Sequence, residues 1–265
     1  MKKLLSVMAM SAVFAASSAY ALENTVKPTV KELGVDTPKS CLIVGNSYSY
    51  YNCNIHSWLR EFTREAKLEW NSRSLTINSA RLSFHNVKEY LKPDKPMDPF
   101  AKKDPMFDVV ILQTQSAEPI TKKNGADENF RQALKMHVAD IRKAGSVPLV
   151  VAPWAKSDKP EEAKLLADAT TQAANDNGIL VVPVGLAFSE SLKLRPDLLL
   201  HRSDKSHPTG AGSYLFGAML YAAIFKKSPV GYKTLGSCDM LLKPEDAKHL
   251  QEVAWKTTKD FYGWK

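Results

Sequence analysis

The stretch Phe107-Asp-Val-Val-Ile-Leu112 determines how the rest of the chain is interpreted. Its last four residues are all apolar, without the alternation typical of a strand that has one face in water. A continuous apolar run of this length indicates a strand buried on both faces. Similar runs occupy residues 41–45, 147–152 and 179–183, and a weaker one occupies 75–77. The chain therefore carries about five strands of the kind found in parallel sheets.

Apolar residues at helical spacing fill the intervals between these runs. We expect helices over 54–67, 87–91, 127–143, 160–175, 209–225 and 243–261. Pro160 suits a first helical turn, and Gly145 and Gly178 suit helix ends. Strands alternating with helices predict a three-layer α/β/α sandwich with a central, mostly parallel sheet of about five strands. Residues 92–103, rich in Pro and Lys, are expected to form an exposed loop, and 22–265 a single domain.

The first 21 residues have the order of a secretory signal peptide. Lys2 and Lys3 precede the apolar run 4–16, and small residues lead to Ala21. We therefore expect cleavage near Ala21 and export to the periplasm or the exterior. The alternative is a membrane anchor, but the run is short for a bilayer span, so no stable membrane insertion is expected.

Composition and charge narrow the class of protein. The 265 residues are 44% hydrophobic and carry a net charge of +8, which excludes a disordered chain. Lys and Arg are scattered rather than gathered in a basic block, so no nucleic-acid partner is expected. The charge suits anionic surroundings such as envelope polymers or phospholipid headgroups, but solubility is the simpler explanation for it.

The three cysteines, Cys41, Cys53 and Cys238, lack the spacing of metal ligands. In an oxidising compartment they allow one disulfide and one free thiol. The sequence alone does not choose the pair.

Ligands of parallel sheets bind beyond the carboxyl ends of the strands, so the residues that follow the strands matter most. Gly45-Asn46-Ser47 follows the first strand, where a serine either presents its hydroxyl or caps a helix. Gln113-Thr-Gln-Ser116 follows the third strand. Two glutamines beside a buried strand need hydrogen-bond partners, which either a cleft or a tied-down loop supplies.

A third segment, Asp204-Lys-Ser-His207-Pro208, precedes the helix expected at 209–225. Asp204 lies three residues before His207, so its carboxylate can contact Nδ1 and orient Nε2 toward a nucleophile. Pro208 restricts the backbone of His207 to an extended form. The alternative is a helix-capping aspartate beside a surface histidine.

In their order and spacing, these three segments resemble the sequence blocks of the SGNH (GDSL-like) hydrolases. The resemblance covers roughly residues 40–231 and is nearest to exported bacterial members with Gly-Asn-Ser in place of Gly-Asp-Ser. Residues 204–215 and Ser-Pro-Val-Gly at 228–231 also resemble those members. The resemblance implies the flavodoxin-like fold of that superfamily.

The resemblance also implies a role for each matching residue. Ser47 corresponds to the nucleophile, His207 to the general base and Asp204 to the residue that orients the base. The Ser47 N–H corresponds to one donor of the oxyanion hole. Ser79 stands where the family has a glycine donor, and Gln115 where it has an asparagine donor. No metal and no cofactor are expected.

We therefore expect an exported serine hydrolase that cleaves an ester of an envelope carbohydrate or lipid, either a small molecule or polymer-borne. Two alternatives use the same fold, namely a non-catalytic carbohydrate- or ligand-binding protein and an acyltransferase with the same triad. A metal-dependent hydrolase is not expected, because no cluster of His, Asp and Glu has ligand spacing.

Other ionisable residues near these segments are expected to have lesser roles. His85 lies six residues after Ser79 and could line the cleft, whereas Glu118 is expected to face water. The remaining histidines are expected on the surface or in structural roles: His56, His137, His201 and His249.

Overall fold

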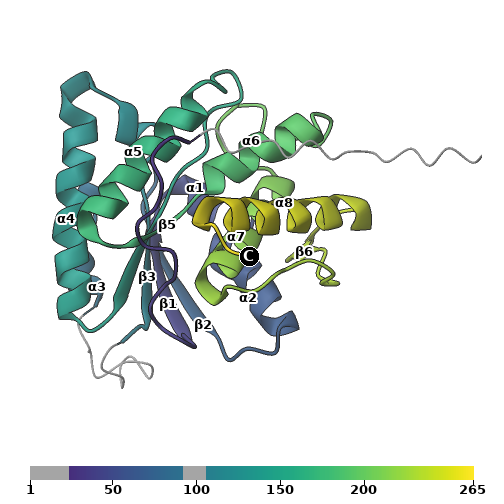
Figure 1. The fold of residues 1–265 in the computed structure, drawn as a ribbon, viewed down its shortest axis with the longest axis horizontal. Coiled ribbons are helices and arrows are strands. Elements are labelled where there is room, and N and C mark those ends of the chain that lie inside the picture. The colour runs from purple at the N-terminus through teal and green to yellow at the C-terminus, as the bar shows by residue number, and fades with distance from the viewer. Residues whose placement is uncertain (1–23, 92–105) are drawn as a thin grey trace, which may run out of the picture.

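The computed structural model describes residues 24–91 and 106–265 (Figure 1). The expected signal peptide and the expected loop at 92–103 lie outside the described residues. Within the described part, no helix combines the length and the apolar character needed to cross a membrane.

The core of the fold is a five-stranded parallel sheet in the order β2-β1-β3-β4-β5. The strands are β1 (Ser40–Gly45), β2 (Asn71–Thr76), β3 (Val109–Gln113), β4 (Val147–Val151) and β5 (Leu180–Val182). This sheet confirms the predicted fold class. The edge strand β2 is longer than the expected 75–77, because its half-exposed residues Asn71-Ser-Arg-Ser74 are polar and give no apolar run.

Helices cover both faces of the sheet, with α4 and α5 on one side and α2, α7 and α8 on the other (Figure 1). The helices are α1 (Ser47–Tyr50), α2 (Ile55–Glu65), α3 (Val87–Tyr90), α4 (Ala126–Lys143), α5 (Glu162–Asn177), α6 (Val184–Leu194), α7 (Gly210–Phe225) and α8 (Pro244–Tyr262). Short 3₁₀ turns occupy Leu82–Phe84, Glu118–Ile120 and Lys123–Gly125.

Besides the four-residue α1 and the short 3₁₀ turns, two elements of the described part were not expected from the sequence. Helix α6 begins directly after β5 at Val184, and no side chain caps its first turn. Strand and helix therefore form one apolar stretch, which conceals the boundary. The second element is a hairpin of β6 (Gly236–Ser237) and β7 (Met240–Leu241), whose two-residue strands are too short to show a period.

Helix α7 is the buried centre of one helical layer. All of its residues from Ala211 to Ile224 are buried, so the helix is apolar on every side. Gly217 lets α2 approach, since a Cβ there would lie 2.9 Å from the Cβ of Trp58. This contact places α2, and the turn that precedes it, against α7.

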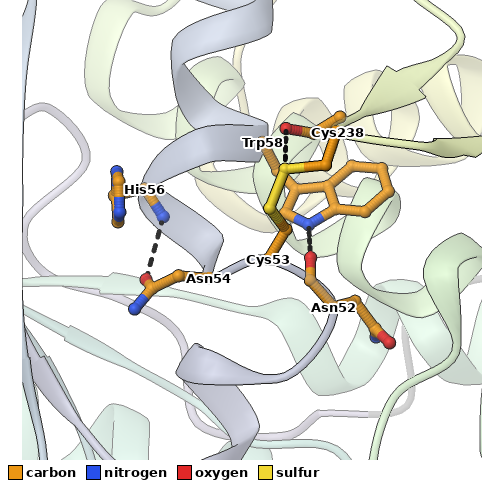
Figure 2. The surroundings of a disulfide bond; sticks show 7 residues. Asn52, Cys53, Asn54, His56, Trp58 and Cys238 are labelled. Atoms are coloured by element: carbon orange, nitrogen blue, oxygen red, sulfur yellow. Dashed lines mark hydrogen bonds between the residues drawn. A yellow bond between two sulfur atoms is a disulfide. The ribbon is translucent and has the colours of Figure 1, made fainter.

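A disulfide between Cys53 and Cys238 joins the turn before α2 to the β6–β7 hairpin, across 185 residues of sequence (Figure 2). Cys41, fully buried in β1, keeps a free thiol. The structure thus selects one of the three pairings that the sequence left open. Burial raises the pKa of the Cys41 thiol well above its usual range, so this cysteine is expected to be unreactive.

We predict that the two classes of cysteine separate by their reaction with iodoacetamide. The folded, non-reduced protein should take up no label, the unfolded non-reduced protein one, and the unfolded reduced protein three. Reduction should also lower the free energy of unfolding by about 2–5 kcal/mol, because the open loop gains entropy in the unfolded state. Intact mass spectrometry and urea unfolding measure both effects. Two or more labels without reductant would contradict the pairing.

Candidate active site

The carboxyl end of β1 carries the first part of the site. Gly45 ends the strand, and Ser47 is the first residue of α1. Asn46 caps this short helix, because its side-chain oxygen accepts a hydrogen bond from the Tyr48 N–H at 3.1 Å. Ser47 thus lies in a tight strand-to-helix turn, with 6% of its surface exposed.

Gln113, at the end of the neighbouring strand β3, holds this turn. Its side-chain oxygen accepts hydrogen bonds from the Asn46 N–H at 3.1 Å and the Ser49 hydroxyl at 2.9 Å. A Cβ on Gly45 would lie 2.6 Å from the same oxygen, so a side chain there would displace this oxygen from its hydrogen bonds. The sequence left two roles for Gln113, lining a cleft or holding a loop by hydrogen bonds. The structure shows the second role.

The Asn46 side chain links the turn to two other loops. Its amide nitrogen lies 2.9 Å from the Ala80 carbonyl and 3.3 Å from the Thr114 carbonyl. An aspartate could not donate these hydrogen bonds, because an ionised carboxylate only accepts. The amide therefore draws the loops after β2 and β3 toward the Ser47 turn.

His207 and Asp204 complete a chain of hydrogen bonds with Ser47. The His207 Nε2 lies 2.8 Å from the Ser47 Oγ, and the His207 Nδ1 lies 2.7 Å from an Asp204 oxygen. Because an ionised Asp204 only accepts, the proton is assigned to Nδ1, and Nε2 then accepts from the serine hydroxyl. The structure thus brings the three residues singled out from the sequence into direct contact.

Asp204 is held in its ionised form by its own loop. Partial burial by itself raises the pKa of this carboxyl group, but the backbone N–H groups of Ser206 and His207, each at 2.9 Å, and the His207 ring outweigh that effect. Together they lower the pKa of Asp204 to about 2. The carboxylate is therefore a permanent acceptor for the His207 ring at neutral pH.

Two aromatic residues fix the loop that carries His207. The Tyr48 hydroxyl lies 2.7 Å from the Ser206 Oγ, and the Trp154 indole N–H donates to the Ser206 carbonyl at 2.9 Å. Tyr48 and Trp154 stack with ring centroids 4.3 Å apart. Since Tyr48 is the residue directly after Ser47, these contacts attach the histidine loop to the turn that contains Ser47.

Tyr51 is a site residue that sequence reasoning missed. Its ring stacks on the His207 imidazole with centroids 4.2 Å apart and planes at 16°, and the Arg202 guanidinium lies 5.2 Å from its centroid. The stack covers one face of the imidazole and limits rotation of the ring. The available signal was the run Ser47-Tyr-Ser-Tyr-Tyr51, which concentrates tyrosines directly after the serine.

The two remaining oxyanion candidates lie one residue away from the carbonyls that Asn46 binds. Ser79 is exposed and has a φ of 56°, a left-handed conformation that favours glycine. Gln115 is half-buried and follows Thr114. Their placement beside the Ser47 turn follows from the Asn46 hydrogen bonds, whereas their role in catalysis stays a prediction.

Glu118 does not face water as expected, because it is 1% exposed. The Thr114 hydroxyl donates to its carboxylate at 2.6 Å, so the buried group has a partner only four residues away. Burial raises the pKa of Glu118, and this hydrogen bond opposes the rise. Glu118 therefore supports the loop after β3 from inside the protein.

The other histidines make structural contacts and are not part of the hydrogen-bond chain from Ser47 through His207 to Asp204. His85 is buried, and its Nε2 donates to the Gly45 carbonyl at 3.1 Å, so it supports the end of β1. Nε2 atoms of His137 and His201 likewise donate to the carbonyls of Leu82 and Ala155, at 2.8 and 2.9 Å. Among residues 24–91 and 106–265, no group of three or more His, Cys, Asp or Glu suits a metal ion.

The sequence matches no protein-family model and no curated protein. Solved structures do match. A DUF4886 family protein from Bacteroides uniformis aligns with a TM-score of 0.59 and 16% identity, over 85% of this chain and 96% of that one. A putative SGNH hydrolase from Slackia heliotrinireducens aligns with a TM-score of 0.50 and 22% identity, over 69% and 97%. An acetylxylan esterase from Geobacillus stearothermophilus aligns with a TM-score of 0.53 and 13% identity, over 73% and 96%.

At these identities the alignments show the fold. The matched neighbours include a putative SGNH hydrolase and acetylxylan esterases, and this chain has a five-stranded parallel sheet flanked by helices. The chain has the fold of the SGNH hydrolases.

Proposed function

We propose that this protein is a serine hydrolase that cleaves carboxylic esters, with Ser47 as the nucleophile. The observation that carries the proposal is the chain of two hydrogen bonds from Ser47 through His207 to Asp204, at 2.8 and 2.7 Å. A serine hydroxyl becomes nucleophilic at neutral pH when a base accepts its proton and an acid orients the base.

The proposed reaction proceeds in two halves. The Ser47 Oγ attacks the ester carbonyl carbon while its proton moves to the His207 Nε2. The tetrahedral intermediate then expels the alcohol, which takes that proton, and leaves an acyl group on Ser47. Water attacks the acyl-enzyme, again losing a proton to His207, and the acid departs as Ser47 regains its proton. Asp204 holds the imidazolium in place throughout both halves.

The negative charge of the tetrahedral intermediate needs donors that are already in position. In our proposal these are the N–H groups of Ser47 and Ser79 and the side-chain amide of Gln115. Each such donor contributes on the order of 3 kcal/mol to transition-state stabilisation. Asn46 supports the arrangement, because it binds the carbonyls next to Ser79 and Gln115.

The proposed substrate is an ester of an envelope carbohydrate or lipid, met outside the cytoplasm. The disulfide and the signal-like N-terminal sequence both favour an oxidising compartment. The acetylxylan esterases among the structural neighbours act on a polysaccharide ester, which supports a carbohydrate. The His207 and Asp204 side chains are 25% and 46% exposed, so the site is open enough for a group on a polymer.

The two alternatives remain distinguishable from hydrolysis. An acyltransferase would use the same three residues, and transfer to an added sugar would then outcompete transfer to water. A binding protein would need no Ser47–His207 hydrogen bond, so the short contact favours an enzyme.

We predict that a fluorophosphonate probe forms a single adduct with the folded protein, on Ser47. The adduct should be lost in Ser47→Ala and in His207→Ala, because the serine is unreactive without its base. Ser72→Ala is the matched control and should keep the adduct, since this serine lies in β2 and its hydroxyl donates to the His56 carbonyl at 3.4 Å rather than to a histidine ring. Intact mass spectrometry and peptide mapping give the result. Absence of an adduct on the wild-type protein would favour the binding protein.

Asp204→Asn should lower kcat by roughly 10³–10⁴-fold, because the amide no longer fixes the histidine tautomer. It should also change stability in a pH-dependent way. A lowered pKa means that the carboxylate stabilises the folded state above the unfolded value of about 3.9, and that this contribution disappears as pH falls toward about 2. The free energy of unfolding, measured with urea, should therefore differ between wild type and variant by a constant amount from pH 5 to 7. This difference should shrink below pH 4. A kcat within ~10-fold of wild type would contradict the role.

Two substitutions separate a side-chain donor from a backbone donor in the oxyanion hole. Gln115→Ala removes an amide and should lower kcat by about 10²–10³-fold, with KM little changed. Ser79→Gly keeps the backbone N–H and suits the φ of 56°, so kcat should stay near the wild-type value. Steady-state kinetics on p-nitrophenyl acetate measure both. Equal losses in the two variants would mean that the donors are assigned wrongly.

A further inference from the structure

The turn between α1 and α2 has an unusual backbone. Asn52, Cys53 and Asn54 are three consecutive non-glycine residues with φ values of 54°, 72° and 64°. Each left-handed residue of this kind costs about 1–2 kcal/mol relative to the right-handed form, although asparagine tolerates it best. Tertiary contacts must therefore hold the turn in this shape.

Most of these contacts attach the turn to α2 and its neighbours. Cys53 forms the disulfide with Cys238, and the Asn52 carbonyl accepts the Trp58 indole N–H at 2.6 Å (Figure 2). The Asn54 side chain accepts the His56 N–H at 3.3 Å and donates to the Ser74 hydroxyl at 2.9 Å. None of these contacts involves the segment that carries His207.

The side-chain amide of Asn52 makes a different connection. Its nitrogen lies 2.8 Å from the Pro208 carbonyl, 2.9 Å from the Thr209 carbonyl and 2.8 Å from the Ser213 hydroxyl. Pro208 directly follows His207 in the chain. In Figure 2 the Asn52 carbonyl faces Trp58, while its side chain extends away from the disulfide.

We propose that Asn52 is a positioning residue for the reaction, which sets the separation of Ser47 and His207 by joining the turn after α1 to the backbone after His207. This inference rests on the proposed hydrolase function. Ser206, on one side of His207, is already held by Tyr48 and Trp154. Asn52 holds the other side, and Tyr51, the residue before it, covers the imidazole face.

Only asparagine meets both demands of this position. Glycine accepts the positive φ but has no side-chain donor, and aspartate has the shape but presents acceptors to two carbonyls. Without the amide, the carbonyls of Pro208 and Thr209 lose their link to the turn after α1, and the segment after His207 keeps only its backbone contacts with residues 200–202. Misplacing a catalytic group by about 1 Å costs roughly 10²-fold in rate.

The experiment compares Asn52→Gly and Asn52→Asp with Asn54→Gly. Asn54 is the matched control, because it belongs to the same turn, has a positive φ and binds Ser74 instead of the histidine segment. Each variant is measured for melting temperature, for kcat and KM with p-nitrophenyl acetate, and for the rate of fluorophosphonate labelling. A crystal structure of Asn52→Gly then gives the distance from the Ser47 Oγ to the His207 Nε2.

We expect both Asn52 variants to lose about 10–100-fold in kcat and in labelling rate, with KM within ~3-fold of wild type. Asn54→Gly should keep kcat within ~3-fold of wild type, even if its melting temperature falls as much as that of the Asn52 variants. In the Asn52→Gly crystal, the Ser47–His207 separation should exceed hydrogen-bond distance, about 3.5 Å.

Other results would overturn the proposal. A normal kcat in Asn52→Gly, an equal loss in Asn54→Gly, or an unchanged Ser47–His207 distance would each show that Asn52 does not position the histidine. A wild-type protein with neither turnover nor labelling would refute the hydrolase function instead. The crystallographic distance would still decide the positioning role, because it needs no activity.

Discussion

The hydrogen bonds accepted by the Gln113 side-chain oxygen are the constraint on which the site depends. They hold the Asn46 N–H and the Ser49 hydroxyl, and so fix both ends of the turn that contains Ser47. This close approach requires β1 and β3 to be neighbours in register, with Val44 opposite Leu112, and requires glycine at position 45. The pairing of β1 with β3 therefore determines both the geometry of the turn and the position of Ser47.

From this turn the site extends through contacts between loops rather than through any single element. The Asn46 amide gathers the carbonyls of Ala80 and Thr114, and Tyr48 and Trp154 hold Ser206 in the histidine loop. Each contact joins segments that are far apart in sequence but follow neighbouring strands or helices. A parallel sheet makes this possible, because the carboxyl ends of its strands meet at one edge.

The predictable parts of this structure are those with a local cause. Continuous apolar runs disclose four of the five strands, and the three-residue spacing of Asp204 and His207 discloses a contact within one loop. The missed parts have distant causes. The disulfide partner of Cys53, the stacking of Tyr51 on His207 and the burial of Glu118 depend on how segments pack, and no local period encodes that.

Ser47, His207 and Asp204 are held firmly but two of them lie partly at the surface, and under the proposed function this bears on selectivity for a substrate. Contacts from Gln113, Tyr48 and Tyr51 hold the Ser47 turn and the His207 loop. The Asp204 and His207 side chains nevertheless remain partly exposed. A cavity of about 360 Å³ lies beside Phe188, which stacks on Trp154. Its lining includes Ala155, Phe188 and His201 but none of Ser47, His207 and Asp204. Among the described residues, this cavity therefore belongs to the surroundings of His201 and not to the hydrogen-bond chain of Ser47, His207 and Asp204. In the proposed function, selectivity would come from the partly exposed surface around Asp204 and His207, which would suit an ester displayed on a larger molecule.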